Sequence, residues 1–141
     1  MCAKFPNVRD YVEVELKATD VDWGDGKSVT AFVVWCIVND CVKRFYKTYP
    51  WQRVRAEVMT LDHGACQLCK ARGLYSPAKV AHHINYLRNR PDLALCIWYA
   101  DAAGQRRRNI IAVCNDCHEA EHKRLELLHQ PKREPVTPER W

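Results

Sequence analysis

Two Cys-x-x-Cys pairs carry the most specific chemistry in this sequence. Cys66 and Cys69 form the first pair, and Cys114 and Cys117 form the second. Zinc binds four ligands in a tetrahedron and takes deprotonated cysteine readily, so two such pairs that meet make a closed structural site. The alternative is two reduced pairs without metal. Because a chain with a small core gains folding energy from a bound metal, we predict a structural zinc site.

Four of the six histidines lie at two places along the chain. His82 and His83 are adjacent, whereas His118 and His122 are spaced i and i+4, which places both on one face of a helix. Imidazoles brought together in this way can bind a divalent ion and leave coordination positions open. A mixed site in which His118 joins the cysteines is the alternative, but it would leave one cysteine unused.

A few short elements must bring these cysteines and histidines together. Short apolar runs predict strands over 77–84 and 109–113, and a helix is expected from the second cysteine pair to about Leu128. The connection over 85–105 is expected to be irregular, with one short helix near 92–95.

The chain before the first cysteine pair contains a predicted strand and two predicted helices. Residues 11–17 alternate apolar and charged side chains, which is typical of a half-buried strand. Residues 28–46 show a helical stripe with Ser28 as the N-cap, although the apolar run within them would also suit a buried strand. Pro50 is well placed in the first turn of a helix over 51–61. The side chains expected to face inward from that helix are Val54, Val58 and Leu61.

Composition and hydropathy exclude several classes of protein. The chain has 141 residues, of which 48% are hydrophobic and 28% charged, which is ordinary for one globular domain and wrong for a disordered chain. Its longest apolar run, 31–38, is far short of the roughly 20 residues of a membrane helix. The first residues lack the apolar stretch of a signal peptide. We therefore expect a cytoplasmic protein with reduced thiols, and no membrane or secreted protein.

The charge is unevenly distributed along the chain. Residues 1–40 carry four basic and seven acidic side chains, a net charge of −3. Residues 41–141 carry 18 basic and 10 acidic side chains, a net charge of +8. A basic segment of this kind suits a polyanionic partner, nucleic acid first, although ordinary surface charge would explain it equally well.

The cysteines and histidines stand in an order that resembles the HNH endonucleases, and more narrowly the small zinc-knuckle HNH endonucleases of bacteriophages. The segments that carry the resemblance are Cys66-x-x-Cys69, Val80-Ala81-His82-His83-Ile84, Asp92-Leu93-Ala94-Leu95 and Asn109-Ile110-Ile111-Ala112-Val113-Cys114-x-x-Cys117-His118-x-x-x-His122. The resemblance covers about residues 45–125. It implies an α+β protein with a ββα-metal core, in which two antiparallel strands and one helix hold a single divalent ion and a four-cysteine zinc site staples the fold. The chain would then divide into an N-terminal strand and helix extension over 1–44, an HNH nuclease domain over 45–129 and a flexible tail over 130–141.

Carried over by position, the resemblance also implies a role for each histidine. His82 and His118 would be metal ligands, His83 the general base that activates water, and His122 a third ligand or a phosphate contact. Asn109 would orient the loop that holds the base. The implied activity is hydrolysis of phosphodiester bonds in double-stranded DNA to 5′-phosphate and 3′-hydroxyl ends. Mg²⁺ or Mn²⁺ is the expected catalytic ion, with Ni²⁺ or Zn²⁺ as further candidates because imidazole also binds them.

Basic side chains around the motif are the candidate DNA contacts, because such residues bind phosphate without reading sequence. The candidates are Arg53, Arg55, Arg106, Arg107, Arg108 and Lys123. Compared with many members of that family, segment 96–108 is expected to be an insertion, and the acidic extension is expected to be a packing or partner-binding element. Two alternatives to a nuclease remain open, both on the same scaffold. One is a zinc-stabilised, non-catalytic DNA-binding module, and the other is a module that binds a phage packaging protein.

Overall fold

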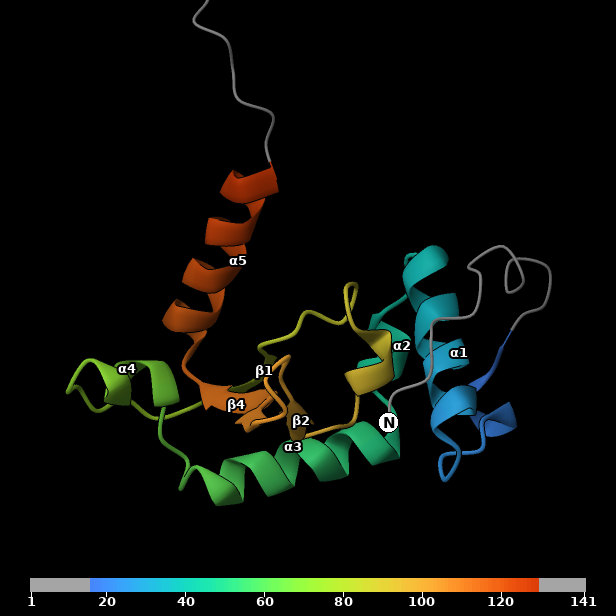
Figure 1. Cartoon of the computed structure of the whole chain (residues 1–141), viewed down its shortest axis with the longest axis horizontal. Coiled ribbons are helices and arrows are strands. Elements are labelled where there is room, and N and C mark those ends of the chain that lie inside the picture. The colour runs from blue at the N-terminus through green and yellow to red at the C-terminus, as the bar shows by residue number, and fades with distance from the viewer. Residues whose placement is uncertain (1–15, 130–141) are drawn as a thin grey trace, which may run out of the picture.

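The computed structural model describes residues 16–129 as a mixed α+β fold with two small antiparallel sheets (Figure 1). The strand expected over 11–17 lies almost entirely outside the described residues. In chain order the elements are the 3-10 helix η2 (Ala18–Asp20), α1 (Gly26–Val38), α2 (Lys43–Tyr46), α3 (Tyr49–Leu61), α4 (Gln67–Ala71), β1 (Val80–His83), the 3-10 helix η3 (Pro91–Leu93), β2 (Trp98–Ala100), β3 (Arg106–Arg108), β4 (Ile110–Val113) and α5 (Asn115–His129).

Strands β1 and β4 form the sheet that carries the histidine pair. They run antiparallel, with His82 opposite Ile111 and His83 opposite Ile110. Helix α5 lies on one side of this sheet and α3 on the other (Figure 1). The strands expected over 77–84 and 109–113 are confirmed as β1 and β4, and the last helix is confirmed with a start at Asn115.

Helix α1 confirms a helix in the extension but corrects its start and its length. The side chain of Asp25, rather than Ser28, accepts the capping hydrogen bond, from the backbone N–H of Lys27. The helix ends at Val38, and Asp40 has a left-handed backbone with φ of 52°. Such a conformation cannot continue a right-handed helix, so the single helix expected over 28–46 is wrong.

Helix α3 confirms the helix expected after Pro50 but corrects one of its inward residues. Pro50 lies in its first turn, and Val58 is completely buried. Leu61 is 44% exposed, whereas the next residue, Asp62, is 5% exposed and takes the buried place beside β4. The inward position expected for Leu61 is therefore wrong, because a polar contact decides the orientation of the chain at this point.

Segment 96–108 corrects a further expectation. It forms a β-hairpin in which β2 pairs with β3 and Trp98 lies opposite Arg108, rather than irregular chain. Gly104 allows the tight turn between the strands with φ of 78°. Three-residue strands are too short to show an alternating pattern, which is why the periodicity missed them. The short helix expected near 92–95 is confirmed as η3.

One main hydrophobic cluster joins the elements, and a smaller cluster surrounds the four cysteines. Residues of α1, α2, α3, β1 and β4 all belong to the main cluster. On α1, Phe32, Val33 and Cys36 are no more than 1% exposed. Residues 26–38 therefore share a core with the segments that carry the histidines. No helix within residues 16–129 combines the length and the hydropathy that crossing a membrane requires.

Candidate metal centre and active site

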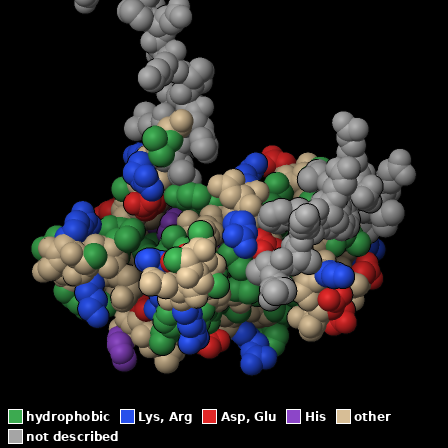
Figure 2. All heavy atoms as spheres, viewed as in Figure 1, with side chains coloured by type: hydrophobic (Ala, Val, Ile, Leu, Met, Phe, Trp, Pro, Cys, Tyr) green, Lys and Arg blue, Asp and Glu red, His purple; other side chains and the backbone are tan. Residues whose placement is uncertain are grey.

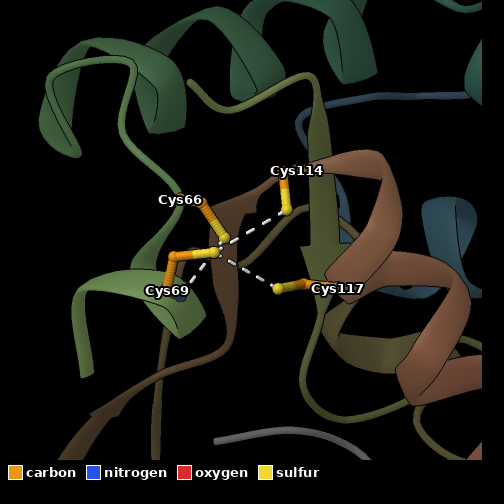
Figure 3. A group of neighbouring side chains, drawn as sticks. All are labelled: Cys66, Cys69, Cys114 and Cys117. Atoms are coloured by element: carbon orange, nitrogen blue, oxygen red, sulfur yellow. Dashed lines mark hydrogen bonds between the residues drawn. The ribbon is translucent and has the colours of Figure 1, made fainter. Parts of the chain in front are cut away.

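The four cysteines of the two pairs lie together at one end of the fold (Figure 3). Cys66 precedes α4 and accepts a hydrogen bond from the backbone N–H of Cys69 at 3.4 Å, while Cys114 and Cys117 stand where β4 turns into α5. The sulfur of Cys69 is 3.5 Å from that of Cys117 and 3.9 Å from that of Cys114. Zinc–sulfur bonds of about 2.3 Å place tetrahedral sulfurs about 3.8 Å apart. The donor set therefore fits one metal ion.

A guanidinium and a backbone amide both place positive electrostatic potential at these sulfurs. Arg72, directly after α4, donates from Nη2 to the sulfurs of Cys117 at 3.2 Å and Cys69 at 3.6 Å. The backbone amide of Cys117 lowers the pKa of the Cys114 thiol to about 6, because a donated hydrogen bond stabilises the thiolate. Burial raises the pKa of the Cys117 thiol to about 12, because desolvation opposes the charge. The sequence did not single out Arg72.

Three of the four candidate histidines also converge. One ring nitrogen each of His82, His118 and His122 lies within 4.8 Å of the others, and the Nε2 atoms of His118 and His122 are 3.0 Å apart. Metal–nitrogen bonds of about 2.1 Å at right angles separate the nitrogens by about 3.0 Å. The three imidazoles therefore fit one divalent ion, with no carboxylate in the cluster as far as the described residues extend.

Burial keeps the imidazoles of His82 and His118 in the form that binds metals. His82 is 6% exposed, and burial together with the neighbouring His118 and His122 lowers its pKa to about 4. Burial and the neighbouring His122 also lower the pKa of His118. Both rings are therefore neutral near pH 7, so each has a nitrogen lone pair for a ligand.

His83 follows His82 in β1 but does not belong to the three-nitrogen cluster. Its ring stacks on Trp51 of α3, with centroids 4.9 Å apart and planes inclined by 20°. Its Nε2 atom lies 2.8 Å from the backbone oxygen of Ala94. Because a carbonyl oxygen only accepts, Nε2 carries the proton and Nδ1 keeps a lone pair in the neutral ring. Burial lowers the pKa of His83, which favours that neutral form.

Asn109 holds the loop that supplies this carbonyl. Its Nδ2 donates to the backbone oxygens of Leu93 at 3.0 Å and Cys96 at 2.8 Å, on either side of Ala94. Its Oδ1 accepts from the side chain of Asn85 at 2.9 Å and from its backbone N–H at 3.3 Å. The side chain is completely buried. Asn109 thus ties the chain after β1 to the loop after η3.

All four histidines border one cavity of about 300 Å³. The other wall comes from α2 and from the chain after β1. Its members besides the histidines are Val42, Tyr46, Ala81, Tyr86, Leu87, Arg88 and Asn89. Tyr86 contacts the rings of His82 and His122, with centroids 5.9 and 6.3 Å apart. The three-nitrogen cluster and the fixed imidazole of His83 therefore open onto the same space.

The candidate DNA contacts are dispersed over the molecule. Lys123 is exposed on α5 beside His122, whereas Arg53 and Arg55 lie on α3, across the sheet from α5 (Figure 1). On the hairpin, the guanidinium of Arg106 lies 4.4 Å from the ring centre of Trp98, and Arg107 pairs with Asp101. Arg108 is bound through both terminal nitrogens by Asp62, at 2.9 and 3.0 Å. Basic and acidic side chains are interspersed on the face shown in Figure 2, so charge does not mark one surface there.

Three further residues that the sequence did not assign support the site. Trp51 forms the floor under the ring of His83, and Tyr86 walls the cavity. Asp62 accepts from Arg108 and, at 2.8 Å, from the backbone N–H of Ala112 in β4, which fastens the sheet to α3. No periodicity or spacing marks such contacts, because their partners are distant in the sequence.

One solved structure resembles this fold. The crystal structure of the HNH endonuclease of the deep-sea thermophilic bacteriophage GVE2, with manganese ion, matches with a TM-score of 0.52 and 23% identity. The match covers 65% of this chain and 89% of that chain. No protein-family model matches the sequence, and the comparison with curated proteins finds no match. At this identity the likeness shows the fold, and the chain has an HNH-like fold.

Proposed function

We propose that this HNH-like chain is a metal-dependent DNA endonuclease that hydrolyses phosphodiester bonds. The proposal rests on the different surroundings of two adjacent histidines of β1. His82 joins His118 and His122 in a three-nitrogen cluster, while His83 borders the same cavity with one ring nitrogen fixed by Ala94. A zinc-stabilised DNA-binding module would need the four cysteines but not this arrangement.

His83 is the proposed general base. With the proton on Nε2 held by the Ala94 carbonyl, Nδ1 accepts the proton of the attacking water. The water oxygen then forms a bond to phosphorus as the bond to the 3′ oxygen breaks. The released 3′ oxygen takes a proton from solvent, which leaves 5′-phosphate and 3′-hydroxyl ends. Trp51 keeps the imidazole ring from rotating away by stacking on it. Asn109 acts as a positioning residue through the loop that contains Ala94.

His82, His118 and His122 would hold the catalytic ion. When bound, a divalent ion supplies positive charge beside the scissile phosphate and the leaving oxygen. Three imidazoles without a carboxylate suit Zn²⁺ and Ni²⁺ better than Mg²⁺, with Mn²⁺ between them. On this donor set, Mn²⁺, Ni²⁺ and Zn²⁺ are better candidates for the catalytic ion than Mg²⁺. The four cysteines would hold a separate, structural zinc ion.

Two exposed basic residues near the cavity are the proposed DNA-backbone contacts closest to the site. Arg88 borders the cavity, and its side chain is 68% exposed. Lys123 follows His122 on α5 and is exposed. Arg106 and Arg107 on the hairpin stay candidates for contacts farther along the DNA. We leave Arg108, Arg53 and Arg55 out of the proposed contacts because of their positions described above.

The test is cleavage of supercoiled plasmid by the full chain, assayed with Mg²⁺, Mn²⁺, Ni²⁺, Zn²⁺ or EDTA. We expect nicked or linear product with at least one of these ions and none with EDTA. His83→Ala should lower the cleavage rate by about 10²- to 10⁴-fold, the usual share of a general base. Its affinity for the ion should stay close to that of the unsubstituted chain, because the three-nitrogen cluster is intact.

His63→Asn is the matched control for loss of a histidine. His63 is exposed after α3 and has a left-handed backbone with φ of 54°, which asparagine tolerates. It should cleave at the unsubstituted rate. DNA binding without cleavage under every ion would favour the binding-module alternative. Cleavage that survives in His83→Ala would show that the base is assigned to the wrong residue.

A further inference from the structure

The proton acceptor that orients His83 belongs to the backbone of the loop over 91–96. The carbonyl of Ala94 is a backbone group, so its position depends on the residues that pack around the loop. Leu93 and Ala94 are 2% and 1% exposed. Asn109 binds the carbonyls of Leu93 and Cys96 on either side, which restrains the two ends of this stretch. The surface of the loop that faces away from Asn109 needs a second support.

Helix α1 is the element that packs against this loop. It contacts η3, which Figure 1 shows in yellow between the β1–β4 sheet and α1. Val29, Phe32, Val33 and Cys36 recur at helical spacing and are at most 7% exposed. These four residues belong to the same hydrophobic cluster as Ala94 and Leu87. Helix α1 therefore packs against η3 at the start of the loop, and its stripe shares one hydrophobic cluster with Ala94.

We infer that α1 is part of the catalytic apparatus, with Val33 and its neighbours on this stripe as positioning residues for His83. This inference rests on the proposed function for its catalytic meaning. Packed side chains hold their neighbours within narrow limits, since interiors are nearly as dense as crystals of small molecules. Slack between α1 and the loop would let the Ala94 carbonyl move away from Nε2 of His83. The imidazole would then lose the contact that fixes its proton on the nitrogen away from the water.

This role differs from a general contribution of α1 to stability. The three-nitrogen cluster is formed by residues of β1 and α5, none of which belongs to the loop or to α1. A loosened loop should therefore lower the rate of the chemical step and leave the affinity for the metal ion and for DNA unchanged. Loss of global stability would change all three together.

Two matched substitutions on α1 separate these outcomes. Val33→Ala removes two methyl groups from the stripe, where the side chain is completely buried. Val34→Ala removes the same groups from a position that is 5% exposed but lies outside the cluster that contains Ala94. Both variants are assayed as full chains at a temperature where circular dichroism shows them folded. The readouts are kcat and KM for plasmid cleavage, Ni²⁺ affinity, and amide hydrogen exchange.

We expect Val33→Ala to lower kcat at least tenfold with KM and Ni²⁺ affinity unchanged, and Val34→Ala to keep all three within twofold. The amides of Leu93, Ala94 and Cys96, which are hydrogen-bonded within the loop, should exchange at least tenfold faster in Val33→Ala than in Val34→Ala. Exchange in α3 is the reference for global opening. Equal kcat values for the two variants, or equal exchange in the loop, would overturn the inference.

The test stays decisive if Val33→Ala does not fold and if the unsubstituted chain cleaves no DNA. If Val33→Ala does not fold, Cys36→Ala removes only one sulfur atom from the same stripe and carries the same expectations. If the unsubstituted chain cleaves no DNA under any ion, the proposed function fails. Hydrogen exchange in the loop still decides whether α1 holds it. The two failures are therefore distinguishable.

Discussion

Replacement of Asn109 by alanine tests how firmly the fold holds the candidate base. The substitution removes four hydrogen bonds, of which two reach the backbone oxygens of Leu93 and Cys96 and two come from Asn85. Asn85 is only partly buried, so water can replace Asn109 there. The carbonyls of Leu93 and Cys96 face a site that is completely buried and would lose this donor.

The expected cost follows from these contacts. A hydrogen bond contributes a net of about 1 kcal/mol. The Leu93 carbonyl keeps the hydrogen bond from the backbone N–H of Cys96, so the cost is that of the lost bonds themselves, two at the buried carbonyls and up to two at Asn85. Together they amount to about 2–4 kcal/mol. For a domain of this size that corresponds to a fall in melting temperature of about 6–16 °C. Asn109→Asp should cost at least as much, because its carboxylate would face two carbonyl oxygens and cannot donate to them.

The assay is urea unfolding followed by circular dichroism at constant zinc, with plasmid cleavage measured on the same samples. The cleavage rate of Asn109→Ala should fall by about 10²-fold, the lower limit of what a general base contributes, even where the variant is fully folded. Asn89→Ala, at an exposed asparagine, is the control for unfolding. A loss of free energy below about 1 kcal/mol would refute the reasoning, because the buried carbonyls would then have found other donors.

Two further substitutions test the supports of the metal site and of the sheet. Arg72→Ala should weaken zinc binding about 10- to 100-fold, because the guanidinium that donates to the sulfurs of Cys69 and Cys117 is lost; transfer of zinc to a colorimetric chelator measures this, and an unchanged rate of transfer would contradict the role. Asp62→Ala should lower the free energy of unfolding by about 3–5 kcal/mol, because it leaves the largely buried Arg108 without its partner. The double variant Asp62→Ala/Arg108→Ala should be more stable than Asp62→Ala alone in urea, and strictly additive losses would exclude the coupling.

The candidate metal ligands could be predicted because their spacing is local. Two cysteines three positions apart present both sulfurs to one point, and His118 and His122 share a helix face whatever the rest of the chain does. The sequence left open whether three or four imidazoles converge, and the structure places His82, but not His83, in the cluster with His118 and His122. Patterns within a few residues therefore predicted both clusters, and the structure brings each cluster together.

The supports of the site could not be predicted, because each joins residues far apart in the sequence. The contact of Asp62 with Arg108, and that of His83 with Ala94, leave no periodic pattern behind. The short β2–β3 hairpin and the early end of α1 were also decided by single turns with left-handed residues, at Gly104 and Asp40.

The sequence by itself determined which side chains are candidate metal ligands and which strands and helix carry them, since spacing fixes direction within an element. Only the tertiary structure decided that α1 packs against η3, and that a backbone oxygen at Ala94 holds the ring of His83. A backbone carbonyl has the same chemistry at every residue, so no amino-acid type marks the one that matters. Its role arises only when the folded chain places it 2.8 Å from a particular imidazole.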